Sequence, residues 1–297
     1  MQRRVFLKLS GALGAGMGLH LLDGHGRSAA DEPAGTPHAE KLGWRLACQA
    51  WTFNYATLFE TIENTAALGL RYLEAFPRQK LSPQQPDVLF KEDASLEVLK
   101  QVRDKLDECG VKLVSYGVCS LYPDMERSRQ TFEFAKQMGI ETIVSEPPAE
   151  AFDTIEKLVK DYGIKLAIHN HPQPSPYWEP KNVLKVCEGR DPRIGACADT
   201  GHWARSGLKP VECLKLLKGR LISLHLKDVD MFERKARDIP WGTGVCEMKE
   251  ILTELHRQDF KGVFALEYES NWGKAMPELA ECIKYFEKVA AELAAKG

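Results

Sequence analysis

Short apolar runs alternate with longer amphipathic segments through most of the chain, beginning near residue 45. Eight of the runs have the length and composition of buried strands, at residues 45–50, 72–76, 112–118, 142–145, 165–169, 194–198, 221–225 and 262–267. The clearest amphipathic segments repeat their apolar residues at helical spacing, at residues 58–68, 96–109, 128–138, 152–162, 248–258 and 278–294. The pattern therefore predicts a repeated strand–helix unit.

This alternation predicts an α/β fold, a single-domain (β/α)8 TIM barrel over residues 43–297. Consecutive parallel strands need right-handed helical crossovers, and eight such units close into a barrel. The rival arrangement is a doubly wound open sheet, but no Gly-x-Gly-x-x-Gly sequence follows the first predicted strand. In a barrel, functional side chains gather where the strands end and the following loops begin.

Residues 1–30 have the pattern of a twin-arginine export signal. Arg3 and Arg4 precede an apolar stretch at residues 9–22 that is too short and too rich in glycine to span a bilayer comfortably. Small residues suit cleavage after Ala30, and residues 31–42 are predicted to be a linker. The mature protein is therefore expected in the periplasm, without a membrane span. Export in the folded state is typical of proteins that load a metal beforehand.

Charge and cysteine content narrow the classes of partner. The predicted signal carries four basic residues and one acidic residue, so its removal makes the chain more acidic than its formal net charge of −2. A nucleic-acid partner is not expected, because no basic stripe remains to neutralise phosphates. The eight cysteines include no Cys-x-x-Cys pair, and most lie in apolar runs, which predicts mainly free thiols. The expected partner is a small carbohydrate, and a homo-oligomer stays open.

Histidines and carboxylates recur at the predicted strand ends. Four of the eight histidines lie there, at His169, His171, His202 and His225. The acidic residues at equivalent positions are Glu74, Glu146, Asp199, Glu267 and Glu269. Any one of these side chains could simply cap a loop through a hydrogen bond. Capping, however, gives no reason for both residue types to recur at the ends of strands four to eight.

Carboxylates that converge at a barrel mouth resist ionising together unless a cation lies between them. A mixed shell of imidazole nitrogen and carboxylate oxygen suits manganese, cobalt, iron, zinc or magnesium. We therefore expect one divalent metal ion, with Mn²⁺ as the first candidate. Two residues keep alternative roles: Glu74 either supports the site from behind or binds substrate, and His202 either hydrogen-bonds substrate or makes an outer contact to the metal.

Four short sequences at the strand ends carry a resemblance. They are Asp199-Thr200-Gly201-His202, His225-Leu226-Lys227-Asp228, Leu266-Glu267-Tyr268-Glu269 and Trp241-Gly242-Thr243-Gly244. They resemble the xylose isomerase-like barrel superfamily of sugar-phosphate isomerases and epimerases, which also includes inosose dehydratases, and the resemblance covers the whole predicted mature chain. It implies metal ligands at Asp199, His225 and Glu267. The family's remaining ligand is a glutamate at the end of strand five, where this chain has His169, with His171 facing the same way.

That difference leaves several catalytic roles open. Family epimerases use the glutamates of strands five and eight as an acid/base pair, while the metal polarises the carbonyl. Glu146 could replace the missing glutamate as ligand or base. Alternatively, His169 is a ligand and His171, Lys227 or Glu269 moves the proton. Lys227 could also stabilise an alkoxide, or form only a salt bridge. The catalytic candidates are Glu146, Glu267, His171 and Lys227, and the metal candidates are His169, Asp199, His225, Glu267 and Glu146.

The residues define the substrate and the reaction class less precisely than the metal site. Aromatic side chains near strand ends suit the apolar face of a sugar ring. The expected substrate-binding residues are Glu74, His202, Trp51, Trp203, Trp241 and Glu269. The leading hypothesis is isomerisation or epimerisation of a sugar by proton abstraction next to a carbonyl, through an enediolate. A metal-dependent lyase or hydratase acting on 3-keto-glycosides would share the first step, and a non-catalytic exported sugar-binding protein is the alternative from another class.

Overall fold

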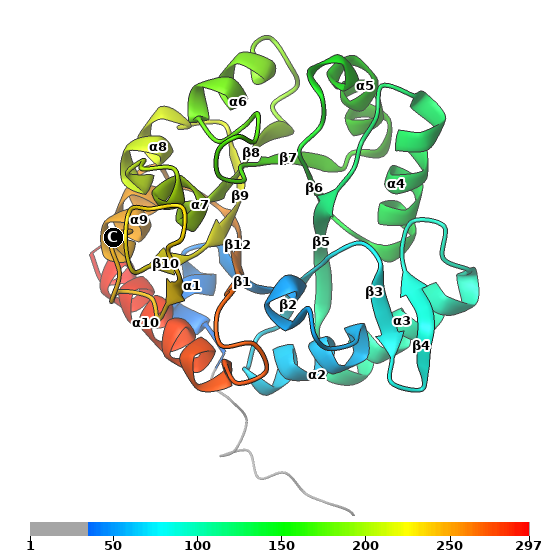
Figure 1. The fold of residues 1–297 in the computed structure, drawn as a ribbon, viewed down its shortest axis with the longest axis horizontal. Coiled ribbons are helices and arrows are strands. Elements are labelled where there is room, and N and C mark those ends of the chain that lie inside the picture. The colour runs from blue at the N-terminus through cyan, green and yellow to red at the C-terminus, as the bar shows by residue number, and fades with distance from the viewer. Residues whose placement is uncertain (1–34, 297) are drawn as a thin grey trace, which may run out of the picture. The chain divides into compact units, whose positions relative to one another are not determined.

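Eight parallel strands form a closed barrel in the computed structural model, which describes residues 35–296. Around the barrel, the strands follow the order β1-β12-β9-β8-β7-β6-β5-β2 (Figure 1). Their bounds are β1 (Trp44–Gln49), β2 (Tyr72–Ala75), β5 (Lys112–Cys119), β6 (Thr142–Ser145), β7 (Lys165–His169), β8 (Ile194–Asp199), β9 (Leu221–Leu226) and β12 (Gly262–Leu266). Each boundary lies within one residue of its predicted position, and the predicted (β/α)8 fold is confirmed.

Helices cover the outside of the barrel (Figure 1). They are α2 (Leu58–Ala67), α3 (Leu96–Cys109), α4 (Met125–Met138), α5 (Phe152–Tyr162), α6 (Pro180–Cys187), α7 (Thr200–Arg205), α8 (Pro210–Leu216), α9 (Met248–Arg257) and α10 (Met276–Ala294). Local sequence sets several of their ends. Thr57 and Glu60 form a capping box at the start of α2, and Ser95 caps α3. Gly110 ends α3 in the left-handed conformation, at φ 65°.

Part of the segment predicted as a linker belongs to the folded barrel. Residues 37–41 form helix α1 (Pro37–Lys41), which packs against α10 and β1. Glu287 of α10 accepts hydrogen bonds from the backbone N–H groups of His38 and Ala39, at 2.6 and 3.2 Å. The linker prediction for residues 31–42 was therefore wrong for this helix, because it is stabilised by a partner distant in sequence. The predicted export signal, residues 1–30, lies outside the described residues.

Two short antiparallel pairs interrupt the strand–helix alternation and were not predicted. The first is a hairpin between β2 and α3, formed by β3 (Gln79–Ser82) and β4 (Gln85–Phe90). The second joins β10 (Asp228–Val229) to β11 (Asp238–Ile239) between β9 and α9. Phe90 anchors the hairpin against Tyr116 and Phe134, with ring centroids 6.1 and 5.1 Å away. Both pairs lie in loops that follow barrel strands, the loops that carry function in this fold.

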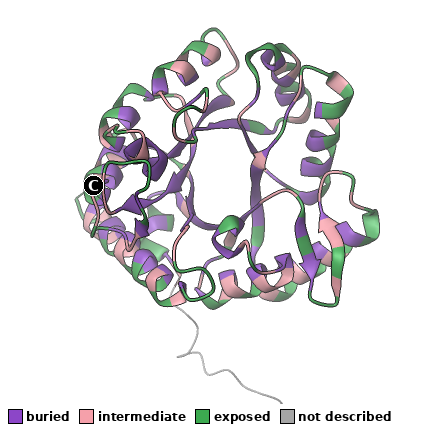
Figure 2. Ribbon diagram, in the orientation of Figure 1, coloured by how far each residue is buried: buried purple, intermediate pink, exposed green. Residues whose placement is uncertain are grey.

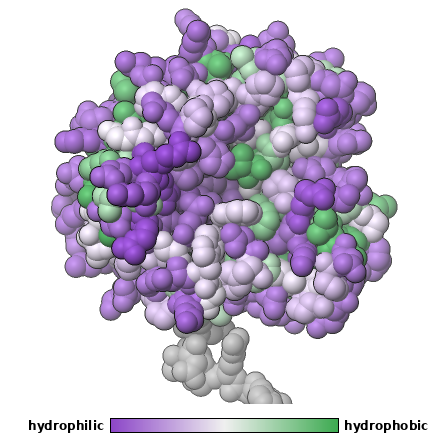
Figure 3. Space-filling view, viewed as in Figure 1, coloured by the Kyte–Doolittle hydropathy of each residue, from purple (hydrophilic) through white to green (hydrophobic). Residues whose placement is uncertain are grey.

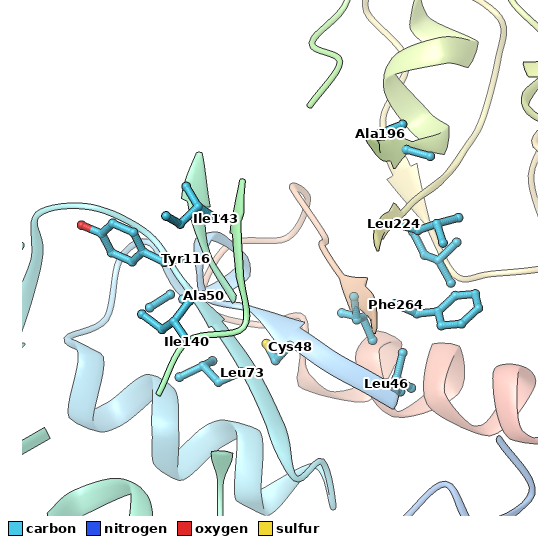
Figure 4. Close-up of a cluster of buried hydrophobic side chains, with 14 of the residues drawn as sticks. Leu46, Cys48, Ala50, Leu73, Tyr116, Ile140, Ile143, Ala196, Leu224 and Phe264 are labelled. Carbon is cyan, nitrogen blue, oxygen red and sulfur yellow. The ribbon is translucent and has the colours of Figure 1, made fainter. Parts of the chain in front are cut away.

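Buried apolar side chains fill the space between strands and helices. The strands are buried almost throughout, whereas the outward faces of the helices are exposed (Figure 2). Figure 4 shows part of this core, with Cys48 of β1 near Leu73 of β2 and Leu46 of β1 near Phe264 of β12. All eight cysteines are free thiols, as predicted, and seven are buried. Burial raises the pKa of Cys48 to about 12, so this residue behaves as a small apolar side chain.

The visible face of the molecule is largely hydrophilic, with a small apolar group near the barrel axis (Figure 3). Within residues 35–296, no helix combines the length and the apolar composition needed to cross a membrane. A polar outer surface over a buried strand layer is the usual arrangement of this fold, and it leaves the ends of the strands as the place for a binding site.

Candidate metal centre

Four ligand-type side chains meet at the ends of four adjacent barrel strands. His169 ends β7, Asp199 ends β8, His225 lies near the end of β9, and Glu267 directly follows β12. The parallel register pairs Asp199 with His225 on the neighbouring strand. One ligand atom from each of the four residues lies within 4.8 Å of the others, and all four residues are buried. The structure therefore brings together four of the five residues predicted as metal ligands.

The free atoms of this group fit a divalent cation. His169 Nε2, Asp199 Oδ2, His225 Nδ1 and Glu267 Oε2 are buried and have no hydrogen-bond partner within the described part of the chain. Buried polar atoms without hydrogen-bond partners are rare, and here four of them lie together, with His225 Nδ1 3.0 Å from Glu267 Oε2 and both carboxylates close to Lys227. Two imidazole nitrogens and two carboxylate oxygens match the ligand preferences of manganese, iron, cobalt or zinc. The residues present thus fit the metal expected from the sequence.

Carboxylates behind the two histidines fix which ring nitrogen is free. His225 Nε2 lies 2.6 Å from Glu74 Oε1, and His169 Nδ1 lies 3.2 Å from Glu146 Oε1. Since a carboxylate accepts the proton that a neutral imidazole carries, each histidine donates away from the centre and keeps its other nitrogen for a metal. Gln49 Nε2 donates to the same oxygen of Glu74 at 3.2 Å and helps to hold that carboxylate in place.

This arrangement shows where two of the predicted glutamates lie. Glu74 is fully buried behind His225 and does not line the neighbouring pocket, so the structure favours support of a ligand over the expected binding of substrate. Glu146 was expected as a ligand or a base. It forms a second possible ligand group with His169 and His171, on the other ring nitrogen of His169, and both of its expected roles stay predictions. Both placements depend on contacts between strands, which the sequence does not show.

Lys227 neutralises part of the negative charge of the group. Its Nζ lies 2.9 Å from Glu267 Oε2, 3.2 Å from Asp199 Oδ2 and 2.7 Å from Glu269 Oε2. Burial alone would lower the pKa of Lys227, but these carboxylates raise it well above its usual value. Burial would likewise raise the pKa values of Asp199 and Glu267, but neighbouring basic side chains hold both well below their usual ranges. Of the alternatives for Lys227, the structure shows the salt bridge.

A pocket of about 350 Å³ adjoins the ligand group at Glu267. Trp51 and Phe76 form one side of it, with ring centroids 5.1 Å apart and the rings nearly perpendicular. His202 lies in the wall, with its Nε2 3.7 Å from Asp199 Oδ2, which is compatible with both of its expected roles. The volume is that of a small-molecule site. The lining residues are Gln49, Trp51, Phe76, Pro77, Gly117, Val118, His171, His202, Glu267 and Glu269.

Two of the three tryptophans expected to bind substrate do not line this pocket. Trp203 and Trp241 are only 1% and 2% exposed and belong to the hydrophobic core. The prediction for these two residues is corrected: short elements beyond the strand ends fold back and bury them, which their spacing alone does not reveal. Trp51, at 40% exposure, is on the pocket wall. The sequence reasoning missed Gln49, although a polar residue closing the first apolar run was an available signal.

His171 and Glu146 form a hydrogen-bonded pair beside the pocket. His171 Nδ1 lies 2.7 Å from Glu146 Oε1, and Ser175 donates to the other carboxylate oxygen at 2.9 Å. Burial would raise the pKa of Glu146, but His169 and His171 hold it below its usual range. The His171 side chain is 49% exposed and lines the pocket. Its other ring nitrogen is therefore available to a bound molecule, and such a pair can move a proton.

A family model described as xylose isomerase-like TIM barrel matches residues 62–286. The chain belongs to this family. A solved structure of an uncharacterised protein from Parabacteroides distasonis ATCC 8503 is 35% identical, with a TM-score of 0.69, and the match covers 83% of this chain and 99% of that one. The structure of a D-tagatose 3-epimerase-like protein is 20% identical, with a TM-score of 0.64 and coverage of 85% and 98%. At that identity it shows the shared fold alone.

Curated relatives of this chain are named inosose dehydratases. Inosose dehydratase 2 of Bacillus cereus is 27% identical over 146 residues, which is 43% of this chain and 48% of that protein. In this match the chain spans about half the length of the relative. Further relatives carry the same enzyme name. The superfamily therefore contains dehydratases as well as epimerases.

Proposed function

We propose that this protein is a divalent-metal-dependent lyase that acts on a keto sugar or a related keto polyol. A proton leaves the carbon next to the carbonyl, and the C–O bond of the substituent on the following carbon breaks. The substituent takes up the proton and leaves as water or an alcohol, and the ring keeps a new double bond. Isomerases and epimerases share only the first step. The dehydratase names of the relatives support the elimination.

The His171–Glu146 pair is the observation that carries this proposal. An epimerase must remove a proton from one face of its substrate and return it to the other, which the family resemblance assigns to two glutamates. Here His169 occupies the place of one of them, and its Nδ1 is engaged by Glu146. The remaining group, His171, suffices for an elimination, because the proton that it takes from carbon can be passed to the leaving oxygen.

The other residues of the site have supporting roles. A cation held by the four free ligand atoms would polarise the substrate carbonyl and stabilise the negative charge that forms on its oxygen. Glu74 and Glu146 orient the two histidines of that group. Trp51 and Phe76 offer an apolar surface to the face of a sugar ring and cover it from water.

Product analysis tests the reaction class. The metal-loaded protein is incubated in D2O with a 3-keto-β-glucoside that carries a chromogenic aglycone. A lyase releases the aglycone and leaves an unsaturated keto sugar, whereas an isomerase or epimerase conserves the substrate's mass apart from incorporated deuterium. Release of the aglycone supports the proposal. Deuterium in an intact glycoside would instead assign the protein to the isomerase class.

Substitution of His171 tests the assigned acid/base group. His171→Gln should lower the rate of release roughly 10²- to 10⁴-fold, the usual contribution of general acid–base catalysis. An ion held by the group of four ligand atoms should stay bound, because His171 belongs only to the second possible group, with Glu146 and His169, and a loss of metal would point to that second group. His256→Gln, on helix α9, is the matched control. A parental rate in His171→Gln would show that another residue moves the proton.

The proposal includes export to the periplasm, which rests on the twin-arginine pattern at residues 1–30. Cell fractionation of the full chain tests it. We expect the parent in the periplasmic fraction and Arg3→Lys, Arg4→Lys in the cytoplasm. Equal distribution of the two forms would contradict the assignment of the signal.

A further inference from the structure

A second pocket lies beside the first. Its volume is about 370 Å³, and the two pockets share Pro77 and Val118. One wall comes from residues 78 and 91–93, at the two ends of the β3–β4 hairpin, which lies outside β5 in the ring (Figure 1). The other wall comes from the end of β5 and the following loop (Cys119, Ser120 and Tyr122) and from the first turns of α4 (Arg127, Gln130 and Thr131). A molecule larger than one sugar ring can therefore reach from the ligand group into this second pocket.

The second pocket carries more basic than acidic side chains. Three basic and two acidic side chains line it. Lys91 pairs with Asp93, with an N–O distance of 3.0 Å. Arg78 and Arg127 form no ion pair with any residue between 35 and 296, and Glu92 is the one acidic side chain left in the wall. Two cations thus face a single anion in a chain whose overall charge is negative.

Arg127 is held in a position that suits an anion. Its guanidinium carbon lies 3.6 Å from the centre of the Tyr122 ring. Stacking occupies the flat face of the guanidinium and leaves its N–H groups free to donate in the plane. Arg127 also lies in the first turn of α4, where Asp124 caps the helix, and the helix dipole disfavours a cation at this end. The stability of helix α4 therefore does not explain why an arginine occupies position 127.

Arg78 is likewise placed at a conformational cost. Its φ is 67°, in the left-handed region that residues other than glycine seldom adopt. The backbone N–H of Arg78 donates to the Phe90 carbonyl at 2.8 Å, which ties the conformation to the hairpin. Backbone strain of this kind concentrates at functional sites. Arg78 directly follows Pro77, which lines both pockets, and Arg78 itself lines the second one.

We propose that this second pocket is a subsite for an anionic substituent of the substrate, a carboxylate, sulfate or phosphate bound by Arg78 and Arg127. Guanidinium groups bind such oxyanions through paired, charge-assisted hydrogen bonds. The keto ring then lies at the ligand group, and the charged part of the same molecule lies beyond Pro77 and Val118. The assignment rests on the proposed function in so far as it takes the first pocket as the site of the keto ring.

Calorimetry with two matched disaccharides tests the subsite. Cellobiose and cellobiouronic acid differ by one carboxylate, and each is titrated into the metal-loaded full chain. The acid should bind about tenfold more tightly, as expected for two partly exposed ion pairs, and the preference should shrink as salt is added. Inorganic phosphate and sulfate should compete with the acid but not with cellobiose. Equal or absent binding of the two disaccharides would overturn the proposal.

Variants separate the subsite from a general effect of charge. The double variant Arg78→Gln, Arg127→Gln should lose the preference and keep the parental affinity for cellobiose. Arg129→Gln is the control, because it removes a charge from the same helix at a residue that does not line the pocket and lies 3.5 Å from Glu126. Circular dichroism confirms folding of each variant. A preference that survives in the double variant, or that Arg129→Gln removes equally, overturns the assignment.

These outcomes are distinct from a failure of the lyase proposal, because the binding preference does not need turnover. An intact preference without release of an aglycone would refute the lyase and leave the subsite standing. Release of an aglycone without a preference would refute the subsite alone.

Discussion

Glu74 should control the affinity for the metal without touching it. Its Oε1 lies 2.6 Å from His225 Nε2, and the side chain is fully buried. Removing a carboxylate behind a metal-bound histidine weakens metal binding about 10- to 100-fold, or about 1.4–2.7 kcal/mol. Glu74→Gln keeps the size and an oxygen that accepts from His225, so we expect the lower part of this range. Glu74→Ala also leaves that ring nitrogen unpaired, so we expect the upper part.

The assay is competition between the protein and a chelator for Mn²⁺, with free Mn²⁺ measured by electron paramagnetic resonance. Glu254→Gln is the matched control, because Glu254 is a buried glutamate on α9 that pairs with Arg257, remote from the strand ends. This control should bind Mn²⁺ as the parent does. If both Glu74 variants bind within about twofold of the parent, the support that a hydrogen-bonded carboxylate gives to a metal-bound histidine does not operate here, and the assignment of His225 Nδ1 as a ligand is wrong.

Three further predictions follow from the structure. Gly195→Ala should cost about 3 kcal/mol or more in urea unfolding, because a Cβ there would lie 2.2 Å from a carbonyl oxygen of the segment leading into β9. Glu141 has a pKa lowered to about 2 by Arg45, against burial and together with Lys112. The ion pairs of Glu141 therefore stabilise the fold above pH 4.5, the pKa of this group in the unfolded chain, and this stabilisation is lost as the pH falls towards 2. Glu141→Gln should lower the melting temperature near neutral pH and not in acid, and a partly exposed pair of this kind contributes about 1 kcal/mol at most. Binding of Mn²⁺ should release about one proton or more near pH 7, because burial lowers the pKa of His225 but neighbouring acidic groups raise it well above its usual value. Calorimetric titrations in buffers of different ionisation enthalpy count the released protons, and a count of zero would contradict the prediction.

The barrel could be predicted from the sequence because each strand–helix unit carries its own pattern. The run at residues 165–169 and the segments at 96–109 and 152–162 were predicted with their observed bounds. Helix α1 and the β3–β4 hairpin were not, because their stability comes from contacts with Glu287 and with Tyr116 rather than from a local repeat. Local periodicity is therefore informative where an element packs against its sequence neighbours, and uninformative where it docks on a distant one.

The candidate site was likewise predictable where the signal is local in sequence and unpredictable where it depends on distant contacts. Strand ends are visible in the sequence, so a group of histidines and carboxylates could be predicted there. The family resemblance implied Asp199, His225 and Glu267 as ligands, and His169 and Glu146 stayed alternatives for the remaining place. The role of Glu74 could not be assigned, because β2 and β9 are not neighbours in the barrel and the two side chains meet only across its interior. The Glu74–His225 contact determines which ring nitrogen of His225 is free. The spacing of residues along the chain carries no information about it.

The charge balance at the strand ends gives a separate reason to expect a cation. Asp199, Glu267 and Glu269 bring three negative charges around Lys227, and Arg205, which lies 3.5 Å from Glu269, also pairs with the carboxylate of Asp238. Burial of unbalanced charge is costly. In the metal-free protein a proton on His225 offsets part of the negative charge, because burial lowers the pKa of this histidine but the acidic groups near it raise it well above its usual value. A divalent ion adds two positive charges to this group and leaves the histidine neutral. The bound cation thus offsets the buried carboxylates more fully than Lys227 does alone, and it would contact four buried ligand atoms to which no hydrogen bond within the described residues is assigned.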